Sequence, residues 1–256
     1  MKLSIVVPVY NEAATVLATL ERVRRTPFPK EIVVVDDGST DGTREVLAAI
    51  ADPTVRVFLH SKNRGKGAAL RTGFAQVTGD YVLVQDADLE YDPQDYPTLL
   101  APLLSGKADV VFGSRFLSGP RRVLFFWHMV ANTLLTLVSN MTTNLNLTDM
   151  ETGYKVLCAD VVHNLHLQSD RFGIEPEITA KVARMRCRIY EVPISYNGRT
   201  YEEGKKIRWT DAFWALVAIL RYGLLPDSVN RGGVPEAVTE VNRAVPTNVD
   251  AGVEAA

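Results

Sequence analysis

The sequence predicts an α/β fold, with a mostly parallel central sheet flanked by helices and amphipathic helices in the second half. Two observations predict it. Short runs rich in Val and Ile recur along the first half of the chain, and segments with helical spacing separate them. Strands of a parallel sheet are buried on both faces, so they read as continuous apolar runs. The chain has 256 residues, 46% of them hydrophobic, which is enough for one large domain.

The first half of the chain alternates between the two kinds of segment. The predicted strands are residues 3–9, 31–37, 55–60, 81–88 and 108–115. The predicted helices are residues 11–25, 39–50, 65–77 and 93–105. In the first of these helices Ala14, Leu17, Leu20 and Val23 fall on one face, as helical spacing requires.

The second half is less regular. Residues 123–141 and 209–225 predict two apolar helices, and residues 187–196 predict a strand. From Pro226 onward the residues show no periodicity, so we expect 226–256 to be a disordered tail outside the core. We therefore expect a single domain over residues 1–225.

Charge and cysteine content exclude some partners. The net charge of -2 gives no general attraction to nucleic acid, and we expect no nucleic-acid partner. The two cysteines, Cys158 and Cys187, lack metal-ligand spacing and predict free thiols in a reducing compartment. The chain shows no secretory signal, which favours a cytoplasmic location.

Acidic and polar side chains follow three of the predicted strands. They are Tyr10, Asn11 and Glu12, then Asp36 and Asp37, then Asp86, Asp88 and Glu90. The carboxyl ends of parallel strands meet at one edge of a sheet, where ligands bind. No fixed cation on the neighbouring strands obviously cancels these charges. We therefore expect a Mg²⁺ or Mn²⁺ ion, shared by Asp86 and Asp88, that holds a diphosphate.

Three other nucleotide-using classes are disfavoured by the same segments. "PVYNEA" after the first strand has no G-x-G-x-x-G dinucleotide motif, and "NRGKGAALRTG" has no P-loop motif. A sugar nucleotidyltransferase would carry a Gly-rich, basic loop after the first strand, and this chain has none.

Five segments resemble the family-2 glycosyltransferases with the GT-A fold. They are "SIVVPVYNE", "IVVVDDGSTDGT", "NRGKGAALRTGF", "DYVLVQDADLEYDP" and "VVFGSRF", in the order of that family. Within the family, the sequence is most similar to the synthases that attach mannose or glucose to dolichol or polyprenyl phosphate. The resemblance extends over about residues 1–210 and implies a nucleotide-binding half (1–115) and an acceptor-binding half (116–225).

The resemblance also implies roles for individual residues. It implies nucleotide binding by Pro8, Tyr10, Glu12, Asp37, Lys66 and Asp86. It implies metal binding by Asp86, Asp88 and Glu90. It implies that the acceptor phosphate binds Arg115, Arg199 and Lys206. "DMETGYK" (149–155) resembles a family segment near the acceptor in which Ser, Phe and Arg stand where this chain has Thr, Tyr and Lys. Asp88, Arg115 and Asp149 are the expected catalytic residues.

The implied reaction is an inverting, metal-dependent transfer of a hexose to a polyprenyl phosphate. UDP-glucose is favoured as donor and GDP-mannose is the alternative. A phosphate acceptor is already ionised at neutral pH, so cations matter more than a strong base. Two other functions remain open. A soluble enzyme acting on a polysaccharide or small-molecule hydroxyl would need a base among Asp149, Glu151, Glu175 and Glu177, and a non-catalytic subunit would only bind a nucleotide sugar.

The two apolar helices predict peripheral contact with a membrane surface, on its cytoplasmic face. Each contains polar residues that do not suit a membrane span. We expect their aromatic and aliphatic side chains to enter lipid, with a basic set facing the headgroups. That set is Arg121, Arg122, Lys205, Lys206 and Arg208. The alternative is that both helices pack in the protein core, in a homo-oligomer or against a membrane partner subunit.

Overall fold

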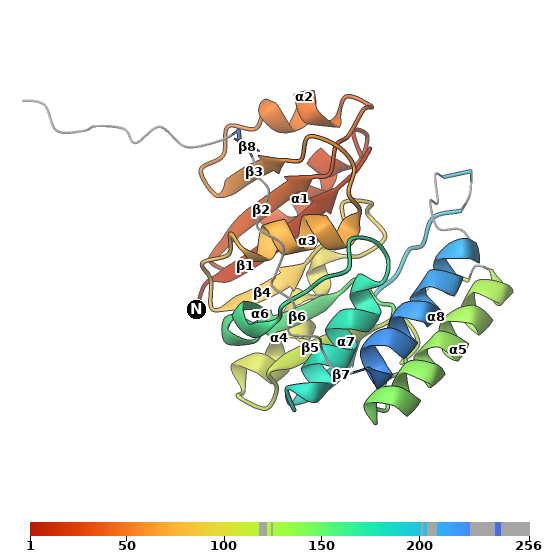
Figure 1. Cartoon of the computed structure of the whole chain (residues 1–256). Coiled ribbons are helices and arrows are strands. Elements are labelled where there is room, and N and C mark those ends of the chain that lie inside the picture. Colours follow the sequence, from red (N-terminus) through yellow and green to blue (C-terminus); the bar gives the residue numbers. More distant parts are fainter. Residues whose placement is uncertain (118–121, 124, 201, 204–208, 226–238, 242–256) are drawn as a thin grey trace, which may run out of the picture.

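A single sheet organises the molecule (Figure 1). The computed structural model describes residues 1–117, 122–123, 125–200, 202–203, 209–225 and 239–241. In that part of the chain eight strands form the sheet, in the order β7-β5-β6-β4-β1-β2-β3-β8. The predicted α/β fold is confirmed.

The parallel core of the sheet comes from the first half. Its strands are β1 (Leu3–Val9), β2 (Lys30–Asp36), β3 (Val55–Leu59) and β4 (Tyr81–Val84). β1 pairs in parallel with β2 and β4, and β2 with β3. β5 (Val110–Ser114) pairs in parallel with β7 (Ile189–Pro193). The carboxyl ends of these strands form one edge, which we call the rim.

One strand that the sequence analysis missed separates β4 from β5. β6 (Lys155–Cys158) runs antiparallel to both neighbours. Because β6 is antiparallel, the loop that enters it, residues 149–154, reaches the sheet at the rim. The strand therefore inserts a segment of the second half between two strands of the first. Its four residues are too few to show a clear pattern in the sequence.

Two helical layers cover the sheet, and alternate residues of β1 show how. Leu3, Ile5 and Val7 pack in one core with α1 (Val16–Arg24), α2 (Thr43–Ala48) and α4 (Tyr96–Leu104), which follows the short helix η1 (Pro93–Asp95). Val6 packs in the other core with α3 (Lys66–Phe74), α6 (Ala159–Asn164) and α7 (Ile174–Arg184). Helices α6 and α7 were not predicted from the sequence.

The two predicted apolar helices lie together at one side of the molecule, next to α7 (Figure 1). They are α5 (Phe126–Thr143) and α8 (Trp209–Leu224). Much of their apolar surface is exposed: Trp127 keeps 75% of its surface accessible and Trp214 keeps 62%. Across the described residues, no helix combines the length and apolar character that a membrane crossing requires.

Part of the expected tail joins the sheet. β8 (Thr239–Glu240) pairs antiparallel with β3, so the expectation that the tail stays outside the fold is wrong for these residues. Arg56 on β3 also pairs with Glu240. The rest of the predicted tail, residues 226–238 and 242–256, lies outside the described residues.

Candidate active site

Asp37 organises the loop that leads into α3. This carboxylate is buried at the end of β2 and accepts hydrogen bonds from the backbone N–H groups of Arg64 and Gly65, at 2.6–3.1 Å. His60 Nδ1 lies 2.7 Å from it. Asp37 was expected to contact the nucleotide, and its described contacts are instead with the chain itself. They place Lys66, the first residue of α3, at the rim.

Lys66 supplies a fixed positive charge to the acidic rim. Its Nζ lies 2.9 Å from Asp86 Oδ1 and 3.1 Å from Glu175 Oε1. The expectation that no fixed cation neutralises the acids is therefore wrong. The cation comes from a helix and so does not lie on the neighbouring strands, where the sequence analysis looked for it.

Arg199 supplies a second positive charge. Its guanidinium lies 3.1 Å from Glu12, 3.3 Å from Asp88 and 3.7 Å from Glu90. Its backbone N–H also donates to Glu90 at 2.7 Å. Arg199 was expected at the acceptor phosphate, and in this structure it joins the ends of β1 and β4. Lys206, expected beside it, lies outside the described residues.

The metal site has fewer ligands than expected. Within the described ranges, no three His, Cys, Asp or Glu side chains come together as a metal-binding group. Glu90 accepts hydrogen bonds from Tyr196 Oη and Arg199 N instead. The segment is also a turn, with Leu89 at a φ of 64°, so the extended alternation assumed for it is wrong. This correction removes Glu90 and leaves Asp86 and Asp88.

Asp86 and Asp88 still fit a hard divalent ion. Burial, with the charges of Asp86 and Glu90, raises the pKa of Asp88 to about 7, so its ionised form lacks sufficient stabilisation here. Mg²⁺ commonly binds through one or two carboxylates, completing its shell with water and substrate phosphate oxygens. The two carboxylates match that donor set.

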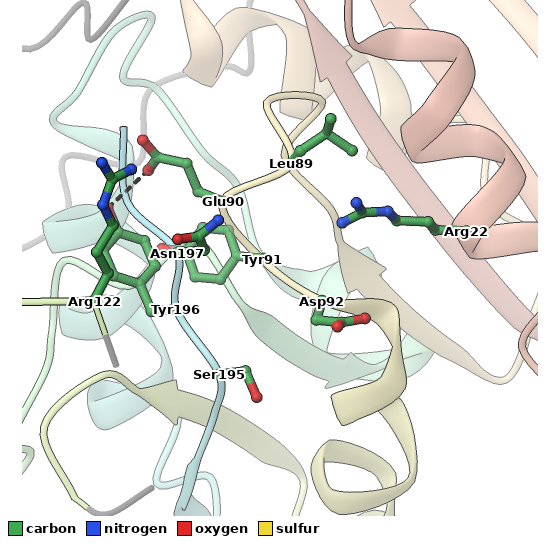
Figure 2. A pocket seen from close by; sticks show the side chains of 9 residues that line it. All are labelled: Arg22, Leu89, Glu90, Tyr91, Asp92, Arg122, Ser195, Tyr196 and Asn197. Atoms are coloured by element: carbon green, nitrogen blue, oxygen red, sulfur yellow. Dashed lines mark hydrogen bonds between the residues drawn. The ribbon is translucent and has the colours of Figure 1, made fainter. Parts of the chain in front are cut away.

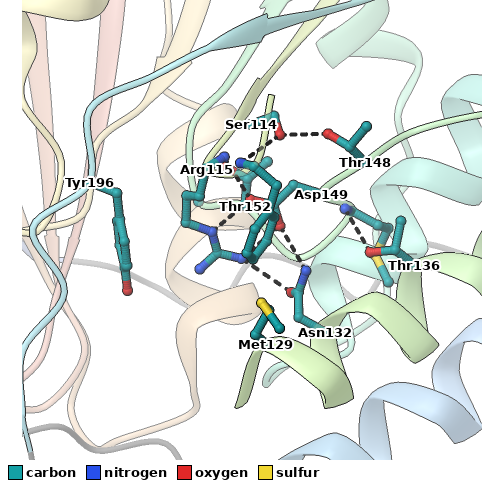
Figure 3. A network of polar contacts seen from close by, with 12 residues as sticks. Ser114, Arg115, Met129, Asn132, Thr136, Thr148, Asp149, Thr152 and Tyr196 are labelled. Atoms are coloured by element: carbon teal, nitrogen blue, oxygen red, sulfur yellow. Dashed lines mark hydrogen bonds and ion pairs between the residues drawn. The ribbon is translucent and has the colours of Figure 1, made fainter. Parts of the chain in front are cut away.

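Arg115 lies at the other side of the rim, at the end of β5 (Figure 3). Its Nε and one terminal nitrogen contact the two carboxylate oxygens of fully buried Asp149, at 2.6 and 2.7 Å. Asn132 of α5 lies 3.2 Å from both partners. The Tyr196 ring stands 5.1 Å from the guanidinium. Asp149 therefore orients Arg115, an arrangement that does not suit a free general base.

A pocket of about 340 Å³ opens beside the acidic turn (Figure 2). It is lined by Arg22, Leu89, Glu90, Tyr91, Asp92, Arg122, Ser195, Tyr196 and Asn197. Of the expected site residues it includes Glu90 alone. The two expected nucleotide residues at the end of β1 lie at the surface of the rim, with Pro8 partly and Tyr10 well exposed.

Between Lys66 and Arg115 lies a set of ionisable groups to which the sequence analysis gave no role in a phosphate-acceptor reaction. Burial and the charge of Glu175 raise the pKa of Glu151 to about 8. Burial lowers the pKa of Lys155 to about 8. Lys155 Nζ donates to the carbonyl oxygens of Met150 and Thr152. This lysine therefore holds the loop between Asp149 and β6.

Comparison with known proteins identifies relatives over most of the chain. The model of the family described as "Glycosyl transferase family 2" matches residues 4–165. An undecaprenyl-phosphate mannosyltransferase of Micrococcus luteus is 33% identical over 88% of this chain and 95% of its own length. A dolichol-phosphate mannosyltransferase of Pyrococcus furiosus is 28% identical over 80% of this chain, which spans 59% of that protein.

Solved structures share the fold. Glucosyl-3-phosphoglycerate synthase from Mycobacterium tuberculosis, crystallised with Mn²⁺, UDP and phosphoglyceric acid, superposes with a TM-score of 0.68. The match covers 89% of this chain and 80% of that one, at 21% identity. The expected GT-A architecture is confirmed.

Replacing Asp149 by Asn should destabilise the protein, because the buried Arg115 charge loses its partner. We expect a loss of about 3–5 kcal/mol in the free energy of unfolding, measured by urea denaturation. Asp109→Asn is the matched control, since Asp109 pairs with the exposed Arg188 and should matter much less. Equal losses in the two variants would contradict the assigned role of Asp149.

Replacing Glu151 by Gln should flatten the pH dependence of stability. The folded state keeps the Glu151 proton up to about pH 8, whereas the carboxyl has a model value of 4.5. Wild-type stability should therefore fall as pH rises from about 5 to 8. Over that window Glu151→Gln should lose less Tm than wild type, by roughly 2 °C or more. Parallel Tm–pH curves for the two proteins would show that Glu151 is not the titrating group.

Proposed function

The chain belongs to glycosyl transferase family 2, and from that premise we propose that it moves a hexose from a nucleotide sugar to the phosphate of a polyprenol. One observation carries the proposal. A carboxylate pair suited to a metal-bound diphosphate and a buried arginine suited to a second phosphate meet at one rim of the sheet. The names of the two relatives above support a polyprenyl-phosphate acceptor.

The donor half of the proposed site is made by the ends of β1, β2 and β4. Pro8, Tyr10 and Glu12 would line the nucleotide, and Asp37 would support it by holding the loop before Lys66. Asp86 and Asp88 would hold Mg²⁺ or Mn²⁺, which when bound would neutralise charge on the diphosphate leaving group. Lys66 beside Asp86 would add a second positive charge at the same diphosphate.

The acceptor half of the proposed site is Arg115 and its supports. A guanidinium binds phosphate through two parallel N–H groups, and Asp149 with Asn132 would hold Arg115 in the required orientation. Arg199 would leave the acids for the acceptor phosphate when the metal and donor bind. The ionised phosphate oxygen attacks the anomeric carbon and the nucleoside diphosphate departs, with inversion at that carbon. Arg115 and Arg199 would hold the two anions together.

The sugar that we propose is mannose, from GDP-mannose. The relatives are named as mannosyltransferases, and this weighs against the glucose that the sequence favoured. A hydroxyl acceptor is the second candidate, and its base would have to be Glu151 or Glu175. Glu177 is buried and occupied by Lys181 and two backbone N–H groups, and Asp149 is held by Arg115.

We propose that the α5–α8 face lies on the membrane that carries the acceptor. Asn132 of α5 contacts Arg115, so this helix joins the acceptor site to an exposed apolar surface. The exposed residues of that surface include Phe126, Trp127, Leu134, Phe213, Trp214 and Leu224. Aromatic side chains of this kind favour the membrane–water interface. Arg122, at the entry to α5, is suitably placed for an anionic headgroup; the other predicted basic residues lie outside the described residues.

Asp88→Asn should lower sugar transfer roughly a hundredfold or more, because a carboxylate that holds the charge-neutralising ion is lost. Transfer from GDP-mannose and UDP-glucose to polyprenyl phosphate would be measured with Mg²⁺ and with Mn²⁺, beside a soluble hydroxyl acceptor. We expect GDP-mannose with the lipid acceptor to be fastest.

Asp80→Asn is the matched control for Asp88→Asn, because Asp80 precedes β4 at the opposite end of the same strand. It should transfer at the wild-type rate. Full activity in Asp88→Asn would refute the metal assignment, and preference for the soluble acceptor would refute the lipid acceptor.

The double variant Trp127→Ser, Trp214→Ser should bind vesicles roughly tenfold more weakly than wild type, because two exposed rings no longer enter the interface. Cosedimentation with vesicles containing anionic lipid measures this. Leu17→Ser, at an exposed position of α1, should leave binding unchanged. Unchanged binding in the double variant, with a lower oligomeric state by light scattering, would instead assign the face to contacts between copies of the chain.

A further inference from the structure

Two buried carboxylates between the donor and acceptor halves have oxygens without a partner. Among the described residues, Glu151 Oε1 and Glu175 Oε2 are inaccessible and accept no hydrogen bond. The Glu175 side chain is only 8% exposed. Leaving a buried carboxylate oxygen unsatisfied is costly, so such atoms usually have a partner in the working state of a protein.

The position of the two oxygens is set by three contacts. Lys66 Nζ contacts both Glu175 and Asp86, so Glu175 lies one side chain away from the proposed donor diphosphate. Glu151 belongs to the loop before β6, two residues after Asp149, the partner of Arg115. This loop approaches Asp86 so closely that a Cβ on Gly153 would lie 2.3 Å from Asp86 Oδ2. The carboxylates therefore stand between the diphosphate and the acceptor arginine.

The chemistry of this position selects the kind of ligand. Carboxylate oxygens accept hydrogen bonds, so the missing partners are donors such as hydroxyl groups. An anion would be repelled by the two carboxylates. A metal ion would compete with Lys66, which already occupies the space beside Glu175 and Asp86. A neutral group with several hydroxyls, adjacent to the diphosphate, satisfies both oxygens.

We propose that Glu151 and Glu175 form the subsite for the hydroxyl groups of the transferred hexose. This inference rests on the proposed function, and it names the residues that select the sugar. Entry is through the partly exposed side chains of Lys66, Asp86 and Glu151. The two carboxylates bind the sugar and leave the nucleotide to the ends of β1 and β2. A site that bonds specific hydroxyls also rejects a sugar that lacks one of them.

The test compares nucleotide sugar with nucleotide for the same protein. Calorimetry with Mn²⁺ would measure the binding of GDP-mannose and GDP, and of UDP-glucose and UDP. Glu151→Ala should weaken the nucleotide sugar that wild type binds by roughly tenfold or more, because a charged hydrogen-bond acceptor is lost. Binding of the matching nucleoside diphosphate should stay within about twofold, since that ligand has no sugar hydroxyl to place in the subsite.

Two further variants keep the result interpretable. Glu175→Gln keeps the size of the side chain and should also weaken the nucleotide sugar more than the nucleotide. Glu21→Ala removes the same charge from an exposed position of α1 and should change neither affinity. Equal weakening of both ligands in Glu151→Ala and Glu175→Gln, or no weakening, would overturn the subsite while leaving the proposed function in place. Wild-type protein that binds no nucleotide or nucleotide sugar would overturn both.

Discussion

The structure depends on balancing negative charge at one rim of a sheet. Parallel strands deliver Glu12, Asp86 and Asp88 to the same edge, and their mutual repulsion is strongest where water is excluded. Lys66 and Arg199 offset it from segments far away in the sequence. The raised pKa of Asp88 shows that the offset is incomplete, and this residual negative charge is what favours a divalent ion and its diphosphate.

The antiparallel strand β6 joins the two functions of the rim. A parallel strand at this position would enter the sheet at the opposite edge. Because β6 is reversed, the loop that contains Asp149, Glu151 and Gly153 lies directly between the ends of β4 and β5. One short strand thus brings the partner of Arg115 and the neighbour of Asp86 within the span of a few residues. It also explains how a donor and an acceptor phosphate could lie a sugar's width apart.

The pair of α5 and α8 gives the molecule a direction. Asn132 faces the Arg115–Asp149 pair, while Trp127 and other apolar side chains of the same helix face outward. The buried residues of α5 are few and include Thr136, which accepts a hydrogen bond from the Met150 backbone, again in the loop before β6. The exposed apolar surface is therefore mechanically continuous with the site. That continuity is the physical basis for assigning the surface to the membrane of a lipid-linked acceptor.

By itself the sequence determined the α/β class, the five strands of the first half, the long apolar helices and the acidic rim. Each follows from local information: apolar periodicity, and the rule that parallel strands end at a common edge. The tertiary structure alone decided the partners. Lys66 of α3 and Arg199 of the segment after β7 neutralise the acids, β6 reverses direction, Glu90 bonds Tyr196, and Thr239–Glu240 add an edge strand. These are contacts between residues far apart in the chain, and pairing of this kind depends on burial and geometry that no local pattern encodes.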